Sequence, residues 1–292
     1  MIKNLKLLIF GGDSRQIEVA KMAAAKGTEV MLVGFDQASD EDIQKWKMTV
    51  SDVDFSQVDA MLLPVSGVDD DGKVHASFSD GDLFLTKEFF QSTPERCVIY
   101  TGIETPYLKQ LISSTNRKLV PLFVRDDLAI LNSIPTAEGV LKLAIEHTEF
   151  MLHGSKVMVL GYGRVGKTIA RIFSGVGANV TVASKHHDEM ARVLECGLTP
   201  IHLKELENEV RTVDICINTI PHLILTPAVL TNMSQNALII DVASKPGGTD
   251  FQYAEKIGLK TLWALGLPGK VAPKSAGEII GKVVVGLLEE DF

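Results

Sequence analysis

The sequence has few cysteines, no run of basic residues and no long apolar segment. Only three of its 292 residues are cysteine, namely Cys97, Cys196 and Cys216, and they lack C-x-x-C spacing. This pattern argues against a disulfide framework or a cysteine zinc site and suits a reducing cytoplasm. Lysine and arginine number 29 against 37 acidic residues, a net charge of −8. Without a basic cluster, we expect no nucleic-acid partner.

The apolar residues are also too scattered for a membrane span, which needs about 18 in succession. The N-terminal apolar run, Leu7 to Phe10, ends at Gly11 and is too short for a secretory signal. We therefore expect a cytoplasmic protein without a membrane partner. The 46% hydrophobic and 23% charged residues are ordinary for a folded chain, and this length suggests about two domains.

An internal repeat divides the chain. Gly11 and Gly27 recur 150 residues later as Gly161 and Gly177, each pair within a strand, glycine turn, helix and strand pattern. Short apolar runs continue in both halves and alternate with helix-period segments. Such alternation indicates parallel sheets built from β-α-β crossovers. The sequence predicts an α/β fold of two doubly wound, Rossmann-like parallel-sheet domains joined by a bridging helix.

Two helices connect the predicted domains. Pro135 and the polar residues after it indicate a bridging helix that begins there and ends at Gly154. Helical spacing over 275–292 predicts a C-terminal helix that packs back on the first domain. We predict an N-terminal domain at 1–135 for substrate and catalysis, completed by that helix, and a cofactor domain at 136–274.

The second copy carries a dinucleotide fingerprint. Gly161, Gly163 and Gly166 follow a strand and open a helix, and Tyr162, Arg164 and Val165 lie between them. In this context the glycines permit a tight turn, close approach of a pyrophosphate and close helix packing. Thr219, Ile220 and Pro221, after a later strand, are further candidate cofactor contacts. The first copy has Asp13 and Gln16 in place of the later glycines, so we do not expect it to bind the nucleotide similarly.

The nucleotide preference is predicted from the end of the next strand. An acidic residue there would hold the ribose 2′-hydroxyl of NAD, but the sequence has Ser184 and Lys185. A hydroxyl and a cation favour a 2′-phosphate and therefore NADP. The adjacent His186 and His187 have no nearby ligand partners, so we predict no metal site.

Polar residues at the predicted strand ends indicate a carboxylated substrate in the cleft between the two sheets. Arg15 and Arg125 are the best candidates, because guanidinium groups bind carboxylates in a two-pronged manner. The expected N-terminus of the bridging helix, Ser133 to Thr136, would offer free N–H groups to a second carboxylate, although simple helix capping explains it equally well. No tyrosine has a lysine four residues later, which disfavours short-chain dehydrogenase chemistry.

Several longer segments resemble the family of dipicolinate synthase A subunits from spore-forming bacteria, and the resemblance spans nearly the whole chain. The segments that carry it are Gly11–Gln16, Val33–Asp36, Arg125–Asp127, Asn132–Gly139, Asp241–Phe251 and Gly266–Gly277.

This resemblance implies an NADP-linked oxidoreductase that converts dihydrodipicolinate, a dicarboxylate from the lysine pathway, to dipicolinate during sporulation. It also implies a flavoprotein-like partner, the B subunit of the synthase, and a place in the mother cell cytoplasm. In that reaction Lys245 or Asp126 would accept the proton while NADP takes the hydride. The sequence is compatible with a homo-oligomer but does not establish the oligomeric state.

Two alternatives remain at this stage. The chain could be a nucleotide-binding partner without catalysis of its own, with the chemistry on the B subunit. It could also be a dehydrogenase of a small oxoacid or amino acid, in the manner of D-2-hydroxyacid and alanine dehydrogenases. Assays with dihydrodipicolinate, pyruvate and alanine distinguish these alternatives.

Overall fold

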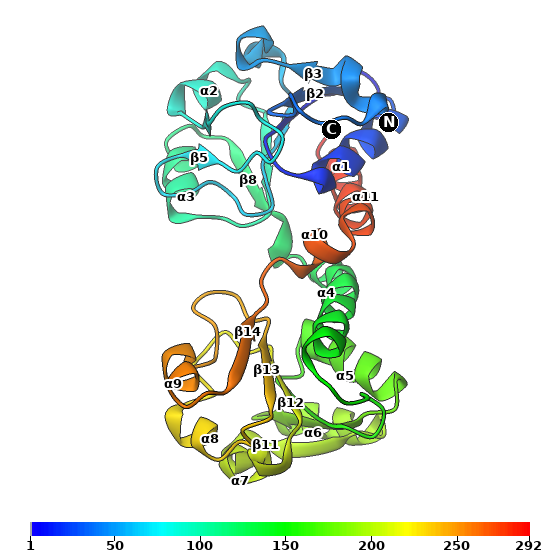
Figure 1. Ribbon diagram of the computed structural model, residues 1–292. Helices are drawn as coiled ribbons and strands as arrows, with labels where there is room; N and C mark the ends of the chain where they lie inside the picture. The colour runs from blue at the N-terminus through cyan, green and yellow to red at the C-terminus, as the bar shows by residue number, and fades with distance from the viewer. Residues whose placement is uncertain (1) are drawn as a thin grey trace. The chain divides into compact units, whose positions relative to one another are not determined.

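Two six-stranded parallel sheets form the framework of the protein (Figure 1). The computed structural model describes residues 2–292. The first sheet has the strand order β3-β2-β1-β4-β7-β8 and the second β11-β10-β9-β12-β13-β14. In each sheet the chain winds outward in both directions from a central strand, β1 or β9. The predicted fold class of two doubly wound α/β sheets is therefore confirmed.

Each strand is short and mostly buried, as crossover-connected strands covered on both faces must be. The strands of the first sheet are β1 (Lys6–Phe10), β2 (Glu29–Val33), β3 (Lys47–Met48), β4 (Ala60–Leu62), β7 (Val98–Thr101) and β8 (Lys118–Pro121). Those of the second are β9 (Lys156–Leu160), β10 (Asn179–Ser184), β11 (Thr199–His202), β12 (Ile215–Asn218), β13 (Leu238–Asp241) and β14 (Lys260–Trp263). A separate antiparallel hairpin contains β5 (Lys73–Val74) and β6 (Leu83–Phe84).

Helices cover both faces of each sheet. In the first half these are α1 (Ser14–Ala25), α2 (Lys87–Ser92), α3 (Pro106–Ser113) and α11 (Pro273–Asp291). In the second half they are α4 (Asp126–His147), α5 (Arg164–Gly175), α6 (His187–Glu195), α7 (Leu206–Glu209), α8 (Pro227–Thr231), α9 (Phe251–Lys256) and α10 (Leu267–Val271). Alternate residues of β1 enter different cores: Leu7 and Ile9 pack with α1 and α11, whereas Leu8 and Phe10 pack with α2 and α3.

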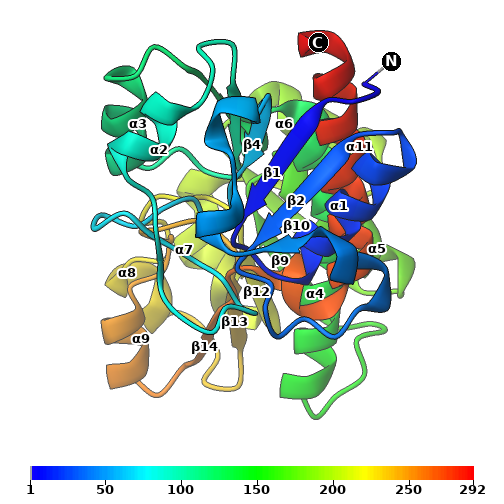
Figure 2. The same cartoon turned by 90° about the horizontal axis from the view of Figure 1, so that it is seen from above.

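The chain divides into two compact units. The first comprises residues 1–129 and 272–292, and the second residues 130–271. The return of the C-terminus to the first unit is seen in α11, which runs beside α1 in both views (Figures 1 and 2). Gly277 permits this close approach, because a Cβ atom there would lie 2.6 Å from the carbonyl oxygen of Arg15. The assignment of substrate and cofactor to separate units stays a prediction.

The bridging helix begins earlier than the sequence suggests. α4 starts at Asp126, and Pro135 lies inside it, so the expected helix start at Pro135 is wrong. The first turn carries Asp126 and Asp127, whose charges suit the positive end of a helix dipole. By length and composition alone α4 is long and apolar enough to cross a membrane, and one face of it, with Ala137 and Val140, is buried in the second unit's core.

The internal repeat is visible in the backbone. Gly11 and Gly161 both have positive φ, +71° and +91°, at the turn that follows the first strand of each unit. Gly27 and Gly177, at +90° and +85°, make equivalent turns before the second strand. Side chains other than glycine rarely adopt this conformation, so the repeated glycines mark repeated turns.

The last turn of α11 is tied to the first sheet by Asp291. Its carboxylate accepts hydrogen bonds from the Tyr100 hydroxyl at 2.7 Å and from the Lys118 ammonium at 2.5 Å. Burial alone would raise the pKa of Asp291, but Lys118 and Tyr100 outweigh it and lower the pKa below its ordinary value. The ionised carboxylate therefore stabilises the folded state.

We expect Asp291→Asn to lower the free energy of unfolding by about 1–2 kcal/mol at pH 7. Because the folded-state pKa is lowered, this contribution is present at neutral pH and is lost as the pH falls through that pKa. The free energies of unfolding of the unsubstituted protein and Asp291→Asn, measured with urea, should therefore become equal at acid pH. Glu290→Gln, at an exposed neighbour, is the control, and an Asp291→Asn deficit that persists undiminished at the lowest pH would contradict the explanation.

Candidate functional site

The glycine turn of the second unit has the geometry that a dinucleotide requires. Gly161 has a φ of +91°, which allows the tight turn between β9 and α5. A Cβ atom on Gly166 would lie 2.2 Å from the carbonyl oxygen of Gly161, so only glycine lets α5 begin this close to β9. These two glycines are required by the protein's own packing.

Gly163 is different, because nothing in the protein requires a glycine there. Its φ is −75°, and an added Cβ would meet no atom of the chain within 4 Å. Gly163 is also the N-cap of α5 and, as a glycine, it has no side chain that could cap the first N–H groups of that helix. An open backbone surface at the positively polarised end of a helix, where the N-cap residue has no side chain, fits an approaching pyrophosphate.

The equivalent turn in the first unit is already closed by a carboxylate. Asp13 is the N-cap of α1 and accepts a hydrogen bond from the amide of Arg15 at 3.0 Å. The side chain of Gln16 accepts from the amide of Asp13 at 2.9 Å and completes a capping box. The carboxylate stands where a phosphate would need the N–H groups, so this helix end does not offer the anion site that α5 offers.

The other residues of the fingerprint occupy varied positions. Tyr162 is buried, and the Lys167 ammonium lies over its ring, 5.6 Å from the ring centroid. Arg164 is exposed at the first position of α5, and Val165 packs partly against the core. Thr219 donates a hydrogen bond to the carbonyl of Leu160 at 2.8 Å.

The segment after β12 therefore supports the glycine turn directly. A Cβ atom on Gly161 would lie 2.7 Å from the Thr219 hydroxyl and 2.9 Å from Ile220. Pro221, the next residue, is exposed. The structure thus brings the predicted cofactor contacts at 161–166 and 219–221 together at the carboxyl ends of β9 and β12.

An acidic residue of α6 that sequence reasoning missed, Glu189, reaches the end of β10. Ser184 is buried, and its hydroxyl donates a short hydrogen bond to the carboxylate of Glu189 in α6 and accepts one from the amide of His186 at 3.1 Å. The hydroxyl is therefore already engaged within the protein. Lys185 is exposed beside it. The signal for Glu189 in the sequence is its place in the first turn of the helix after β10.

A second unpredicted feature is the buried carboxylate of Asp241 at the end of β13. It accepts hydrogen bonds from the side chain of Asn218 at 3.0 Å, the amides of Ala243 and Gly248 at 3.0 and 2.9 Å, and the hydroxyl of Thr249 at 2.7 Å. These contacts fix the loop that carries Lys245, whose own side chain is exposed.

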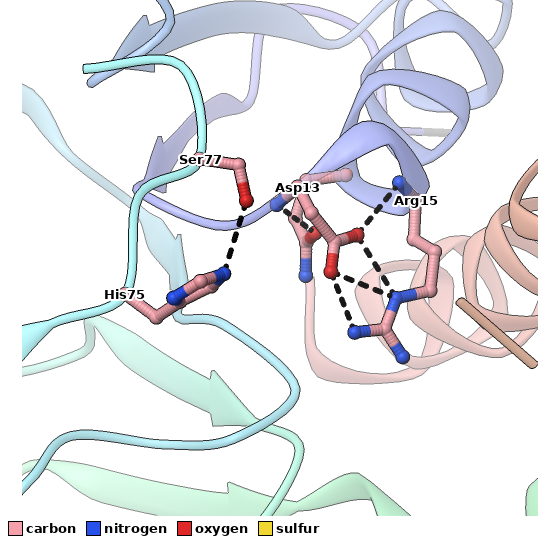
Figure 3. A network of polar contacts seen from close by, with 5 residues as sticks. Asp13, Arg15, His75 and Ser77 are labelled. Atoms are coloured by element: carbon pink, nitrogen blue, oxygen red, sulfur yellow. Dashed lines mark hydrogen bonds and ion pairs between the residues drawn. The ribbon is translucent and has the colours of Figure 1, made fainter. Parts of the chain in front are cut away.

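Arg15 and Asp13 form a bidentate pair at the end of β1 (Figure 3). The Arg15 guanidinium donates to Asp13 Oδ1 at 2.9 Å through Nε and to Oδ2 at 2.6 Å through Nη2. Burial would raise the pKa of Asp13, but the hydrogen bond and charge of Arg15 outweigh it and lower that pKa. The guanidinium of Arg15, predicted to bind a substrate carboxylate, is thus paired with a carboxylate of the protein, that of Asp13.

His75 and Ser77 face the same strand end (Figure 3). The Gly12 amide donates to the carbonyl of His75 at 2.7 Å, and the Ser77 amide donates to the carbonyl of Gly12 at 2.8 Å. This parallel bridge extends the edge of the sheet beyond β1. The imidazole Nε2 lies 3.0 Å from the Ser77 hydroxyl. Sequence reasoning assigned these residues no role, because nothing local links the hairpin at 73–84 to β1.

Arg125 also has a partner in its own chain. It donates to the carboxylate of Asp127 through Nε at 3.1 Å and Nη2 at 2.9 Å. This hydrogen bond lowers the pKa of Asp127 below its ordinary value. Asp126, the predicted proton acceptor, is exposed in the same helical turn.

Ser133 and Thr136 do not form a helix end. Ser133 is buried in the interior of α4, where its hydroxyl contacts the carbonyl of Ile130 and the hydroxyl of Thr168, each at 2.6 Å. Thr136 donates to the carbonyl of Asn132 at 2.8 Å. Because α4 begins at Asp126, the backbone groups at 133–136 are inside the helix, and the predicted anion site at that place is wrong.

The first unit also contains a cavity of about 470 Å³ beside the hairpin. His75 and Lys73 line it together with three aspartates, Asp69, Asp70 and Asp82. Lys73 pairs with Asp82 at 2.7 Å. The carboxylates outnumber the single ammonium, so the lining formed by these residues carries a net negative charge.

Comparison with known proteins assigns the family. The chain is 47% identical to the dipicolinate synthase A subunit of Bacillus subtilis (strain 168) over 290 residues, which is 99% of this chain and 98% of that protein. The chain belongs to the family of dipicolinate synthase A subunits. The model of that family's N-terminal domain matches residues 6–123. The resemblance predicted from the sequence is therefore confirmed.

Solved structures agree with this assignment to the dipicolinate synthase family. The crystal structure of the A subunit from Bacillus halodurans has a TM-score of 0.96 and 48% identity, covering 99% of both chains. A transhydrogenase from Sinorhizobium meliloti shares the fold, with a TM-score of 0.72 at 15% identity over 97% of this chain and 93% of that one.

The second unit has its own family relationship. Residues 143–258 match the model of the alanine dehydrogenase/PNT C-terminal domain, which implies a nicotinamide nucleotide as cofactor. This range contains the glycine turn, Ser184 and the segment after β12. The dehydrogenase-like fold supports an oxidoreductase.

Proposed function

We propose that the chain oxidises dihydrodipicolinate to dipicolinate, working with the B subunit of the synthase in the cytoplasm of a sporulating cell. The observation that carries this proposal is the 47% identity, over both units, to a dipicolinate synthase A subunit, together with the open space beside the Gly163 backbone at the start of α5. The oxidised nicotinamide nucleotide supplies a hydride acceptor. The residues of this chain bind the substrate and remove a proton.

Arg15 and Arg125, both in the first unit, are the proposed ligands of the substrate carboxylates. Each guanidinium already donates two N–H groups to an aspartate, Asp13 or Asp127. A substrate carboxylate would therefore bind through the remaining N–H groups or replace the aspartate. The paired aspartates keep both guanidinium groups oriented before the substrate arrives. Lys245 or Asp126 is the proton acceptor in the hypothesis drawn from the sequence.

A spectrophotometric assay tests the function directly. The chain, alone and with the B subunit, should form reduced nucleotide when dihydrodipicolinate is supplied. Nucleotide binding without turnover under both conditions would instead support a non-catalytic partner of the B subunit. Turnover with pyruvate or alanine in place of dihydrodipicolinate would support an oxoacid or amino-acid dehydrogenase.

We further propose that the nucleotide is NADP. The exposed ammonium of Lys185 directly follows β10, where it would attract a 2′-phosphate. Glu189, bonded to Ser184 at the same strand end, would repel that phosphate and instead suit the 2′-hydroxyl of NAD. The proposal therefore requires the attraction of Lys185 to exceed the repulsion of Glu189.

Two substitutions are expected to change the nucleotide preference in opposite directions. Lys185→Asp should weaken NADPH binding at least tenfold, about 1.4 kcal/mol, with little loss of NADH binding. Glu189→Gln should strengthen NADPH binding several-fold because it removes the opposing charge. Nicotinamide fluorescence titrations measure both, and Lys256→Asp, at an exposed lysine of α9, is the control. Equal binding of NADH and NADPH that neither substitution alters would contradict the NADP proposal.

A further inference from the structure

We propose that His75 accepts the proton released when dihydrodipicolinate becomes aromatic, and that Ser77 holds its imidazole in the reactive tautomer. This inference rests on the proposed function and adds to it a base that the sequence pattern does not indicate. It replaces Lys245 and Asp126 in that role.

The position of His75 depends on hydrogen bonds between segments that are far apart in the sequence. Residues 75–77 run parallel to Gly12 at the carboxyl end of β1, held by hydrogen bonds of 2.7 and 2.8 Å. β1 is the strand from which the first sheet winds in both directions. Ligands of open α/β sheets bind at this switch point, outside the carboxyl ends of the strands. The parallel bridge therefore positions His75 at the end of the sheet where folds of this kind bind their ligands.

The arrangement around the ring defines which nitrogen can act. Nε2 lies 3.0 Å from the Ser77 hydroxyl, and the hydroxyl has no other hydrogen bond among the described residues. When Ser77 accepts the Nε2 proton, the lone pair of the neutral imidazole is on Nδ1. Nδ1 is then the base. The arrangement follows the general pattern of a base oriented by a further polar group.

Charged groups from several neighbouring segments surround the imidazole of His75. Asp13, beside His75 at the α1 N-terminus, has a favourable charge interaction with it, although Arg15 neutralises much of that carboxylate. The cavity side contributes further charges from the hairpin and the loop before it, namely Asp69, Asp70, Lys73 and Asp82. Among these cavity groups the carboxylates outnumber the single ammonium of Lys73.

His75 is better placed for the step than the alternatives. It lies at the carboxyl end of β1, beside the pair formed by Asp13 and Arg15 (Figure 3). Lys245 lies in the loop after β13, and Asp126 lies in the first turn of α4. A neutral imidazole also has a lone pair that can accept a proton.

The step balances as a two-electron oxidation. One ring C–H bond of dihydrodipicolinate breaks with its electron pair, and the hydride passes to the oxidised nicotinamide nucleotide. The adjacent carbon loses a proton to His75 Nδ1, and that C–H electron pair forms the new ring double bond. The products are dipicolinate, reduced nucleotide and one proton, which the imidazole later releases to water.

The test is the substitution His75→Gln in the full chain, assayed with the B subunit. We expect kcat to fall at least 100-fold with little change in KM. In the unsubstituted protein kcat should rise with pH as the imidazole loses its proton, and His75→Gln should lose this limb of the profile. Ser77→Ala should lower kcat less and alter the same limb, and Ser77→Thr, which keeps the hydroxyl, should restore it.

A second measurement needs no turnover. Dipicolinate, added to the chain with isotope-labelled histidine, should shift the imidazole NMR signals of His75. His147→Gln, at a histidine in the last turn of α4, is the matched control and should leave kcat, the profile and the His75 shift unchanged. Normal NADPH binding and an unaltered melting temperature in His75→Gln would show that the variant is folded.

The outcomes separate the two proposals. If the unsubstituted protein neither turns over dihydrodipicolinate nor binds dipicolinate, the proposed function fails and this inference with it. If the unsubstituted protein is active but His75→Gln keeps its kcat and its pH profile, only the role of His75 is overturned. A His75 signal that dipicolinate does not shift would overturn it independently.

Discussion

Gly163→Val should abolish nucleotide binding while leaving the protein folded. The φ of Gly163 is ordinary, and an added Cβ meets nothing within 4 Å, so the side chain itself fits. Valine is a poorer N-cap than glycine, and we expect unfolding to become easier by no more than about 1 kcal/mol. The same side chain would occupy the space of the pyrophosphate. We expect affinity for NADPH to fall at least 100-fold, about 2.7 kcal/mol.

Two further glycines of α5 make the comparison specific. Gly175→Ala also places a Cβ in open space, but at the far end of the helix, and should leave nucleotide binding unchanged. Gly166→Ala places a Cβ 2.2 Å from the Gly161 carbonyl oxygen. It should therefore reduce both stability, by about 1–3 kcal/mol, and binding.

Fluorescence titration and urea unfolding of the three variants measure both quantities. The distinguishing result is a Gly163→Val protein that loses no more than about 1 kcal/mol of stability but does not bind the nucleotide. If Gly163→Val bound NADPH as tightly as the unsubstituted chain, the pyrophosphate would not lie at this turn.

Asp241→Asn should cause the largest loss of stability among the single substitutions considered. Both carboxylate oxygens of Asp241 accept hydrogen bonds: Oδ1 from Asn218 and the Ala243 amide, Oδ2 from the Gly248 amide and Thr249. An asparagine of the same shape has only one such oxygen, so its NH2 group must face two donors. Buried donors without acceptors cost about 1–3 kcal/mol each, and we expect a loss of about 2–4 kcal/mol.

The matched control is Asp188→Asn, which makes the same chemical change at an exposed position of α6. It should alter the free energy of unfolding by no more than about 0.5 kcal/mol. Urea unfolding at pH 7 gives both values. Equal stability of the two variants would mean that the loop at 243–249 keeps its structure without the carboxylate.

The hydrogen bonds of Asp241 also lead us to expect a change in the stability of the loop that carries Lys245. Gly248 packs so closely that a Cβ would lie 2.3 Å from Nδ2, the side-chain nitrogen of Asn218. When Asp241 no longer holds the Gly248 amide, the loop should open first. Hydrogen exchange at Ala243 and Gly248 should therefore accelerate more in Asp241→Asn than exchange within β12.

The repeated plan of the fold could be predicted from local patterns. Runs such as Leu7–Phe10 and Val157–Leu160 are apolar on both faces, which is what a strand covered by helices on two sides requires. Gly11 and Gly161 follow these runs because the turn needs a positive φ. Strand identity, turn chemistry and the nucleotide fingerprint all depend on residues a few positions apart, so the sequence displays them directly.

The start of α4 shows where local reasoning gave the wrong answer. Proline favours the first turn of a helix, so Pro135 suggested a helix start. The helix begins instead at Asp126, nine residues earlier, and continues through Pro135 because Ala137, Val140 and Ala144 bury one face of it in a core. Tertiary packing overrode a local preference, and the predicted anion site at 133–136 was lost with it.

Other features depend on side chains that meet only in the folded chain. Ser184 and Lys185 suggested NADP, but the carboxylate that bears on this preference reaches Ser184 from Glu189 in the next helix. Likewise, Arg15 was available in the sequence as a carboxylate ligand, whereas its bidentate pairing with Asp13 depends on side-chain geometry.

Local sequence patterns were sufficient to define the two sheets, their glycine turns, the unit that carries the nucleotide fingerprint and the family resemblance. The position of His75 beside Asp13 required the folded chain, because residues some 60 positions apart meet through a bridge between a hairpin and the end of β1. Backbone periodicity has a range of a few residues. A site assembled from separate segments has no such period, and its geometry exists only once the sheet has formed.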